Sequence, residues 1–217
     1  MSLLTSTQTQ GPEHEPGLIT YDYETYGDVA TQGREGSYHY EAVRQRFHPD
    51  VPIISCGSFD EVFGMLDQGD AAFAVVAVDN SKQGLVTNQD GLANRQRIEQ
   101  SPHPIITPSI LLEVQLCLIG LPGAEPENLR RVSSHPAALN QTREWLGLHL
   151  PGVEIVPHED TAGAVADLQN TDEAAIASRE AALHYGGHVL HVIQREPELT
   201  EFDVLQSAAQ LDVSINS

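Results

Sequence analysis

An uninterrupted apolar run that stops abruptly at polar residues constrains this 217-residue chain more than any other feature. Every residue from Ala71 to Val78 is apolar, and the run is followed by Asp79-Asn80-Ser81-Lys82-Gln83-Gly84. Upstream of the Gly69-Asp70 break, apolar residues recur at helical spacing, at Phe59, Val62, Phe63 and Leu66. The sequence therefore predicts a helix, a turn and a buried strand whose carboxyl end is polar.

The polar residues at the end of this predicted strand are the first candidates for a ligand site. In an open α/β sheet, loop amides and side chains converge at the carboxyl ends of parallel strands, so ligands bind there. Asn80 and Ser81 occupy that position in the sequence. The same residues also suit an ordinary turn, because Asn, Asp and Ser side chains hydrogen-bond to their own backbone. The local sequence is compatible with both interpretations.

Strand-like and helix-like segments alternate along the first half of the chain. We expect strands over residues 28–32, 52–56 and 71–78, and helices from about residue 37 and, behind the cap Ser58, over 59–68. Two strand-helix units followed by a strand predict a parallel, right-handed, doubly wound start. After Gly84 we expect a helix over about residues 88–97. The apolar stretch from Ile105 to Gly120 then predicts a strand that crosses into a second sheet.

The second half repeats this outline. We expect strands ending at 131–136 and over 153–156, 174–177, 188–192 and 202–205, with helices over 137–148, 161–168 and 180–185. The predicted fold class is α/β, with two Rossmann-like subdomains and a cleft between them. The predicted boundaries are an N-terminal extension over residues 1–27, a first subdomain over 28–106 plus 190–217, and a second over 107–189.

The charge balance excludes some classes of partner. The formal net charge is -20, from 31 acidic against 11 basic residues, and Lys82 is the only lysine. Nucleic acid and anionic membranes are poor partners for such a surface. No apolar run approaches the roughly 20 residues of a membrane span, and residues 1–17 lack a signal-peptide pattern, so we expect a cytoplasmic protein. An acidic, lysine-poor surface also suits a salt-rich cytoplasm.

Residue spacing predicts no metal site. His103, His158 and His191 do not have the spacing of metal ligands. Cys56 and Cys117 lie far apart with no second pair, which is typical of buried apolar thiols.

Three further segments carry side chains that suit a binding or catalytic role. The loop Gly33-Arg34-Glu35-Gly36-Ser37 opens a helix, where free amides can hold an anion. Ser133-Ser134-His135-Pro136 mirrors Asn80-Ser81 at a strand end, although it also suits an ordinary helix cap. Gln141 faces the cleft if the first turns of the helix predicted over 137–148 point towards it.

Thr200 lies in residues 197–202, which we expect to link two strands at the mouth of the cleft. Its hydroxyl either donates a proton to a leaving group or has only the structural role of starting the last strand.

Together and in this order, these segments resemble the catalytic domain of the prephenate dehydratase family over about residues 32–205. The glycine loop with Ser37-Tyr38 resembles the family's Gly-Pro-x-Gly-Thr-Phe/Tyr-Ser, and Asp79 to Gly84 resembles its Glu-Asn-Ser-x-x-Gly. Ser134 to Gln141 resembles Ser-His-Pro-Gln-Ala-Leu-x-Gln, and residues 174–178 and 185–186 resemble Ala-Ala-Ile-Ala-Ser and Tyr-Gly. Thr200-Glu201-Phe202 stands where the family has Thr-Arg-Phe.

The resemblance implies a lyase of phenylalanine biosynthesis. Prephenate loses its ring carboxylate as carbon dioxide and its ring hydroxyl as water, giving phenylpyruvate, and aromatisation removes the need for a cofactor. The resemblance also implies a two-lobed fold similar to periplasmic binding proteins, a small anionic substrate, and a homodimer or higher oligomer. By matching position, Thr200 assists departure of the hydroxyl. The substrate-binding residues expected on this basis are Ser37, Asn80, Ser81, Ser134, His135, Gln141, Phe202 and Arg34.

The departures from the family pattern concern charge and size. The family's Arg after the catalytic Thr is Glu201 here, its loop Pro is Arg34, its first-helix Ser is His39, and its Gln after His-Pro is Ala137. A Glu in place of a carboxylate-binding Arg repels an anion. Three arrangements would remove this repulsion. Arg34 or Lys82 supplies the positive charge that the missing Arg would have given, Glu201 points to solvent, or the ligand carries an ammonium group, as arogenate does.

Three alternatives to prephenate dehydration therefore stay open at this point. They are arogenate dehydration, prephenate decarboxylation with retention of the hydroxyl, and a catalytically degenerate domain that only binds a small ligand. We also expect no regulatory module after the catalytic domain, since the sequence ends at Ser217.

Overall fold

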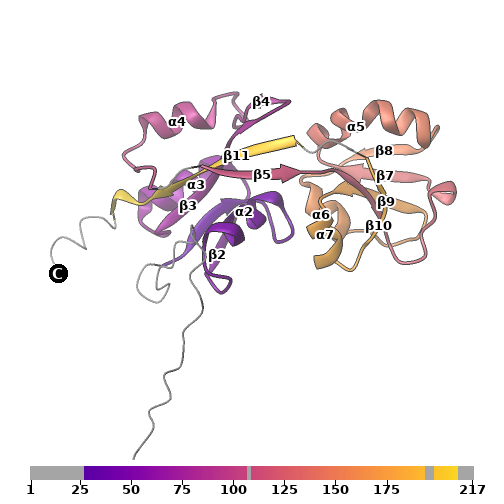
Figure 1. Ribbon diagram of the computed structural model, residues 1–217, viewed down its shortest axis with the longest axis horizontal. Helices are drawn as coiled ribbons and strands as arrows, with labels where there is room; N and C mark the ends of the chain where they lie inside the picture. The colour runs from indigo at the N-terminus through magenta and orange to yellow at the C-terminus, as the bar shows by residue number, and fades with distance from the viewer. Residues whose placement is uncertain (1–26, 107–108, 194–197, 210–217) are drawn as a thin grey trace, which may run out of the picture.

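The computed structural model describes residues 27–106, 109–193 and 198–209, which form two α/β halves lying side by side (Figure 1). The first half contains a six-stranded sheet in the order β2-β1-β3-β11-β5, with β4 paired to β3. Its strands are β1 (Val29–Gln32), β2 (Ile53–Cys56), β3 (Phe73–Asn80), β4 (Gly84–Leu85), β5 (Ile110–Val114) and β11 (Glu198–Gln206). Its helices are α2 (Tyr38–Arg46), α3 (Phe59–Gln68) and α4 (Asn94–Gln100).

The second half contains a five-stranded sheet in the order β10-β6-β9-β7-β8. Its strands are β6 (Cys117–Gly120), β7 (Arg131–Ser134), β8 (Glu154–Pro157), β9 (Glu173–Ala177) and β10 (His188–Val192). Its helices are α5 (Pro136–His149), α6 (Thr161–Ala166) and α7 (Arg179–His184), with a 3-10 turn at Pro126–Asn128. The predicted fold class, α/β with two Rossmann-like halves, is confirmed.

The two halves repeat one strand arrangement. In the first, β1 pairs in parallel with β2 and β3, and β11 pairs antiparallel with β3. In the second, β7 pairs in parallel with β8 and β9, and β6 pairs antiparallel with β9. The parallel start expected from two strand-helix units is therefore present in both halves, and each carries an antiparallel strand beside its central one.

The chain crosses between the halves twice. The apolar stretch around residues 110–120 divides into β5, in the first sheet, and β6, in the second, so the predicted crossing strand is confirmed as two strands. The chain returns through β11, which lies between β3 and β5 (Figure 1). Since β5 belongs to the first sheet and β10 to the second, we propose that the subdomain boundaries lie between Val114 and Cys117 and between Val192 and Glu198, rather than at 107 and 190.

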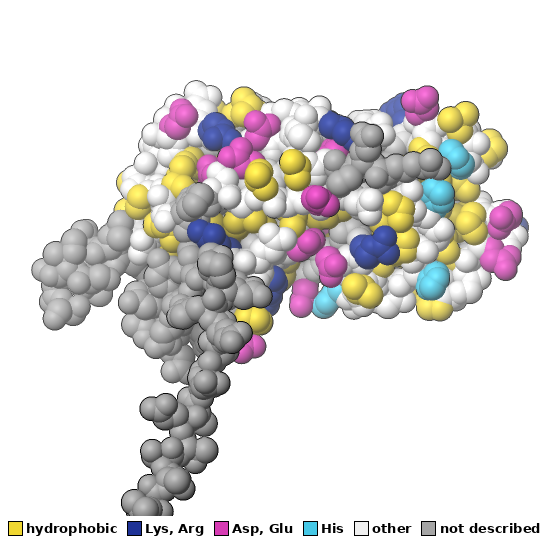
Figure 2. All heavy atoms as spheres, viewed as in Figure 1, with side chains coloured by type: hydrophobic (Ala, Val, Ile, Leu, Met, Phe, Trp, Pro, Cys, Tyr) yellow, Lys and Arg dark blue, Asp and Glu magenta, His cyan; other side chains and the backbone are white. Residues whose placement is uncertain are grey.

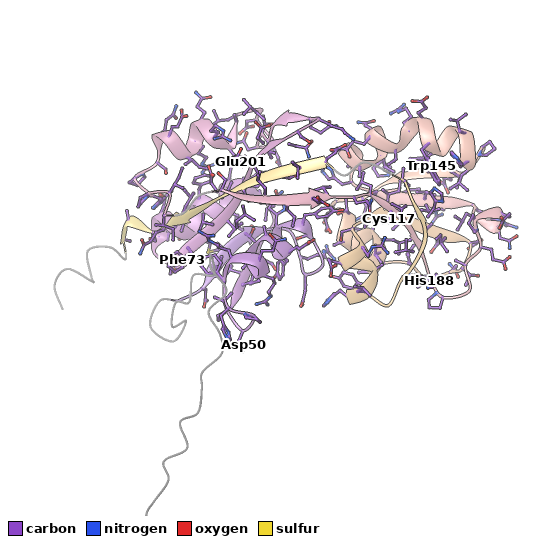
Figure 3. All side chains as sticks on the ribbon, in the orientation of Figure 1. Asp50, Phe73, Cys117, Trp145, His188 and Glu201 are labelled. Carbon is purple, nitrogen blue, oxygen red and sulfur yellow. The ribbon has the colours of Figure 1, made fainter. Side chains whose placement is uncertain are left out.

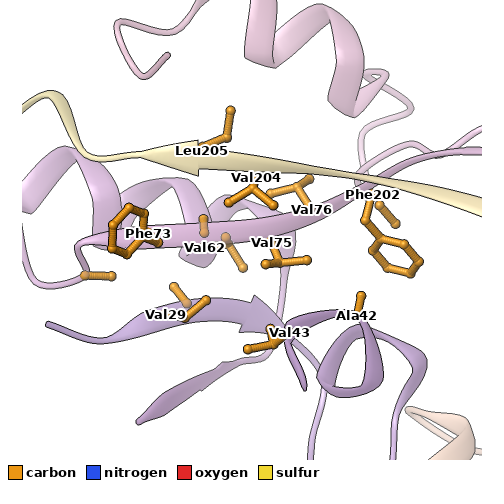
Figure 4. Close-up of a cluster of buried hydrophobic side chains, with 14 of the residues drawn as sticks. Val29, Ala42, Val43, Val62, Phe73, Val75, Val76, Phe202, Val204 and Leu205 are labelled. Atoms are coloured by element: carbon orange, nitrogen blue, oxygen red, sulfur yellow. The ribbon is translucent and has the colours of Figure 1, made fainter. Parts of the chain in front are cut away.

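Strand β3 is the centre of the first core. Its side chains from Phe73 to Val78 are all buried, which is what an uninterrupted apolar run requires. Figure 4 shows Val75 and Val76 of β3 among valines of β1, α2 and α3 and beside Phe202 and Val204 of β11. Burying a side chain of this size stabilises a fold by roughly 1.5–3 kcal/mol. The helix-turn-strand unit predicted from this stretch is confirmed, including its cap, since the Ser58 hydroxyl accepts a hydrogen bond from the Glu61 amide.

Two predicted elements differ most from the structure in where they begin. The helix expected over 88–97 begins only at Asn94, because the Asn88 side-chain oxygen accepts hydrogen bonds from the amides of Asp90 and Leu92 and so closes a turn. The link expected over 197–202 is strand from Glu198 onward, because residues 198–202 pair with β5 on one side and β3 takes up pairing on the other from Thr200. Pro197 and all but the last residue of the predicted N-terminal extension lie outside the described residues.

The loop between β1 and α2 joins the two halves. The Ser178 hydroxyl donates to the Gly36 carbonyl at 2.9 Å, and the Tyr185 hydroxyl donates to the Glu35 carbonyl at 2.9 Å. Behind it, the Tyr38 hydroxyl donates to the Gln115 carbonyl and accepts from the Gln115 amide. These contacts hold α7 and the first crossing against the first half.

Gly36 is required at this contact for two separate reasons. Its φ is +82°, and a Cβ there would lie 3.1 Å from the Cα of Ala181. Gly91 has nearly the same φ, +80°, but open space around it. A substitution at Gly91 therefore tests backbone strain alone, whereas a substitution at Gly36 tests the same strain together with the close contact between the halves.

We expect Gly36→Ala to lower the free energy of unfolding by roughly 2–3 kcal/mol and Gly91→Ala by about 1 kcal/mol, since only the first change adds a clash to the left-handed strain. Urea unfolding of both variants measures the difference. Equal losses would show that the halves can separate at this loop without cost.

Candidate functional site

A cleft of about 670 Å³ lies between the two halves, where several strands end. From the first half it is lined by the end of β1 and its loop, by the start of α3, by the end of β3 with the segment through residue 89, and by β11. From the second half it is lined by the start of α5 and by the segment before α6. The cleft thus lies at the carboxyl ends of parallel strands of both sheets, as expected for an α/β ligand site.

The structure brings five of the nine candidate residues to this cleft. Those that line it are Ser37, Asn80, His135, Thr200 and Phe202. The other four, Arg34, Ser81, Ser134 and Gln141, are not among the lining residues. Gln141 is half-buried on α5. The remaining three support residues that do line the cleft.

Asn80 and Thr200 meet across the pairing of β3 with β11. The Asn80 Nδ2 donates a hydrogen bond to Thr200 Oγ1 at 2.9 Å. The Asn80 Oδ1 accepts from the amides of Lys82 and Gln83 at 3.0 and 2.9 Å, which fixes the orientation of the side-chain amide. Since Thr200 Oγ1 already accepts from Asn80, its own proton is available to a group in the cleft. The pair is therefore arranged as a hydrogen-bond donor.

Ser81 secures the strand that carries Thr200. Its hydroxyl accepts from the Leu199 amide at 3.0 Å and its amide donates to the Leu199 carbonyl at 2.8 Å. Both bonds act on the residue before Thr200. Ser81 is therefore a positioning residue, and the turn interpretation of residues 79–84 holds together with the site interpretation.

Ser134 has a similar supporting role in the second half. It is fully buried, and its hydroxyl donates to the Ile176 carbonyl of β9. The neighbouring His135 caps α5, since its Nδ1 accepts from the Ala137 amide at 3.2 Å. Burial lowers the pKa of His135, although nearby Asp160 opposes this. With Nδ1 accepting, the neutral ring carries its proton on Nε2 and can donate from there.

His39 lines the cleft and was not among the predicted site residues. Its ring lies 5.3 Å from that of Phe202, edge to face, and 5.7 Å from that of Phe59. Burial lowers its pKa to about 4, and its Nε2 is buried without a hydrogen-bond partner. The ring is therefore neutral near pH 7. The sequence signals were its place in the first turn of the helix after the glycine loop and its substitution for the family's first-helix Ser.

The basic residues near the cleft are engaged by carboxylates. Arg34 Nε lies 2.9 Å from Asp160 Oδ2, so this arginine bridges the two halves instead of lining the cleft. Arg97 pairs with Asp60 of α3. Lys82 Nζ lies 3.7 Å from Glu198 Oε1. Neither Arg34 nor Lys82 is placed as a free cation for an anionic ligand.

Glu201 does not line the cleft. It follows Thr200 on β11, where Figure 3 labels it. Its carboxylate pairs with Arg95 of α4, with 2.7 Å between Arg95 Nη2 and Glu201 Oε2. Hydrogen bonding with Ser109 and the charge of Arg95 hold the pKa of Glu201 below its ordinary value of 4.5. Glu201 is therefore oriented away from the cleft and is held by an ion pair rather than pointing freely to solvent.

The described residues place no metal-ligand set in the cleft. Across residues 27–106, 109–193 and 198–209, no three His, Cys, Asp or Glu side chains converge as a metal site. Within the same ranges no helix has the length and apolarity needed to cross a membrane. Acidic side chains are spread over both halves on the face shown in Figure 2.

The neutral His39 makes a pH-dependent contribution to stability. Its pKa is about 4 when folded and 6.5 ordinarily, so the unfolded chain binds a proton more readily. We expect stability to fall by up to about 3 kcal/mol as pH drops from 6.5 towards 4, relative to His39→Phe. Chemical denaturation across this range measures it. The exposed His188→Phe is the control, and a pH-independent difference between wild type and His39→Phe would contradict a buried neutral ring.

Comparisons with known proteins identify related sequences and folds. The family model for prephenate dehydratase matches residues 29–210. Arogenate dehydratase 5, chloroplastic, of Arabidopsis thaliana is 35% identical over 165 residues, which are 75% of this chain and 37% of that protein. This chain therefore spans well under half the length of that curated relative.

Two solved structures share the fold. The prephenate dehydratase of Arthrobacter aurescens in complex with L-Phe has a TM-score of 0.68 at 25% identity, over 83% of this chain and 60% of that one. GqqA, described as a novel type of quorum quenching acylase, has a TM-score of 0.66 at 28% identity, over 83% of this chain and 64% of that one. The two-lobed arrangement expected from the sequence is thus that of a prephenate dehydratase.

Proposed function

Because this chain belongs to the prephenate dehydratase family, we propose that its cleft catalyses the decarboxylating dehydration of prephenate or of arogenate. The bond between the ring and its carboxylate breaks, and carbon dioxide leaves. The electron pair completes the aromatic ring as the carbon-oxygen bond of the ring hydroxyl breaks. One proton from the medium completes the departing water. The product is phenylpyruvate from prephenate or phenylalanine from arogenate.

The observation that carries this proposal is the hydrogen bond from Asn80 to Thr200 inside the cleft. The leaving oxygen gains negative charge as its bond to carbon breaks, so a fixed donor beside it lowers the barrier. Thr200 has its proton free for this purpose, because Asn80 occupies one of its acceptor positions. A threonine hydroxyl is too weak an acid to give up its proton completely, so its part is hydrogen-bond stabilisation of the departing hydroxide.

The walls of the cleft suit a cyclohexadiene ring. Phe59 and Phe202 line it together with Leu85 and Val114. His39 lies against both phenylalanine rings and is neutral, so it extends this surface without adding charge. Apolar and aromatic side chains with a few placed polar groups are typical of small-molecule sites.

The cytoplasmic location, the oligomeric state and adaptation to salt remain predictions from the sequence and family. The alternatives to dehydration remain distinguishable by product. A prephenate decarboxylase yields a non-aromatic product that keeps the hydroxyl, and a binding domain yields none.

The proposed part of Thr200 predicts a difference between two substitutions. We expect Thr200→Val to lower kcat by roughly a hundredfold or more, with little change in KM, because the leaving group loses its donor. Thr200→Ser keeps the hydroxyl and should stay within about tenfold of wild type. The assay follows phenylpyruvate by absorbance in alkali and phenylalanine by chromatography.

Three results of this assay would count against the proposal in different ways. Full activity of Thr200→Val would remove Thr200 from the reaction. A hydroxylated, non-aromatic product from wild type would establish decarboxylation instead. Absence of any product from both substrates would favour the binding domain.

The orientation of Asn80 is tested separately by Asn80→Asp. The new carboxylate keeps an oxygen for the amides of Lys82 and Gln83, but its second oxygen accepts the Thr200 proton instead of donating to Thr200. We expect kcat to fall by roughly tenfold or more with the thermal midpoint largely retained. The exposed Asn140→Asp is the matched control. Unchanged kcat would mean that the Thr200 proton does not face the substrate.

A further inference from the structure

The charges that line the cleft are all of one sign among the described residues. Three carboxylates line it, from Asp60, Glu159 and Asp160, and no lysine or arginine of the described ranges does so. Carboxylates are costly near an anionic ligand unless each is paired. The ligand preference of the cleft therefore depends on which of the three charges remains unpaired.

Two of the three carboxylates are neutralised within the protein. Asp60 pairs with Arg97, and its Oδ1 also accepts from Asn88 at 3.4 Å. Asp160 pairs with Arg34 at 2.9 Å and also caps α6, where its Oδ1 accepts from the Gly163 amide at 2.5 Å. Each therefore contributes little net charge to the cleft.

Glu159 is different. Its side chain is exposed, it lines the cleft, and it has no ion-pair or hydrogen-bond partner among the described residues. Its position directly before Asp160 is held by the bonds that fix the start of α6, including that from Asp160 to Gly163. An unpaired carboxylate carried by an anchored backbone segment at the cleft is available to a cation on the ligand.

The two substrates of the proposed reaction differ by one charge at one atom. Both carry two carboxylates, but arogenate has an ammonium group where prephenate has a keto oxygen. A free carboxylate attracts the first group and repels the more negative of the two molecules. We propose that Glu159 is a specificity-determining residue that makes this cleft prefer the ammonium-bearing substrate. This inference rests on the reaction proposed above and names the substrate class for it.

The pairing of the nearby arginines with protein carboxylates adds to the proposed preference for the ammonium-bearing substrate. In a cleft that selects a dianion, an arginine is the natural partner for the second carboxylate. Here Arg34 and Arg97 are held by acidic partners, and Arg95 is held by Glu201 outside the cleft. The protein thus keeps its nearby guanidinium groups from the ligand while leaving one carboxylate free.

The test compares kcat/KM for arogenate and for prephenate in wild type, Glu159→Gln and Glu159→Lys. Wild type should favour arogenate, and Glu159→Gln should lower the arogenate-to-prephenate ratio by roughly threefold to tenfold, the scale of an exposed charge interaction. Glu159→Lys should lower it further. Raising the salt concentration should reduce the ratio in wild type and leave it nearly constant in Glu159→Gln. The exposed Glu127→Gln, on the 3-10 turn away from the cleft, is the control and should keep the wild-type ratio.

Binding measurements separate failure of this inference from failure of the proposed reaction. Calorimetric titration of arogenate and prephenate into Thr200→Val, with and without Glu159→Gln, reports the preference without turnover. Tighter arogenate binding that depends on Glu159 supports the inference even if no product forms. An unchanged ratio in Glu159→Gln, by kinetics and by binding, overturns it even if both substrates are dehydrated.

Discussion

The pairing of β11 between β3 and β5 is the interaction on which the site depends. The chain leaves the first half through β5, builds the second half, and returns through β11. Only this return places Thr200 opposite Asn80, a residue 120 positions away in the chain. Phe202, Val204 and Leu205 of β11 are buried in the core on both faces of the strand, and this burial holds the register that brings the two polar side chains together. A slip of one residue would place Glu201 in the cleft and Thr200 beside α4.

Charge pairing decides what the cleft presents to a ligand. A chain with 31 acidic and 11 basic residues has few cations available, and those near the cleft are committed to carboxylates of the protein. The substitution that looked most disruptive in the sequence, Glu201 in place of an arginine, is compensated by Arg95 on the neighbouring helix. Glu201 therefore adds no unpaired negative charge to the cleft. The cleft itself is lined by hydrogen-bonding groups, by aromatic rings and by the carboxylate of Glu159.

The sequence predicted the fold well where apolar patterning was strong. The run from Ala71 to Val78 and the helical spacing before it identified the central strand and helix, and the repeat of that pattern identified the second half. Prediction failed where polar side chains compete with regular structure. The Asn88 side chain closes a turn that delays α4, and no local pattern distinguishes residues 198–201 from a linker, because their pairing with β3 and β5 is wholly non-local. His39 was noted as a departure from the family pattern but was not predicted as a site residue, because its contact with Phe202 on a distant strand is non-local.

By itself, the sequence determined the α/β class, the repeated half, and the presence of small polar residues at strand ends, because all of these follow from local periodicity and turn chemistry. Only the tertiary structure decided which of those residues face the cleft and which hold the surrounding strands in place. Asn80 and Thr200 face the cleft, whereas Ser81 and Ser134 hold the strands that carry or support them. Arg34 and Glu201 are both withdrawn from the cleft by partners on other elements. The physical reason is that hydrogen bonds and ion pairs form between whichever groups the packed core brings within reach, and sequence spacing does not encode that distance.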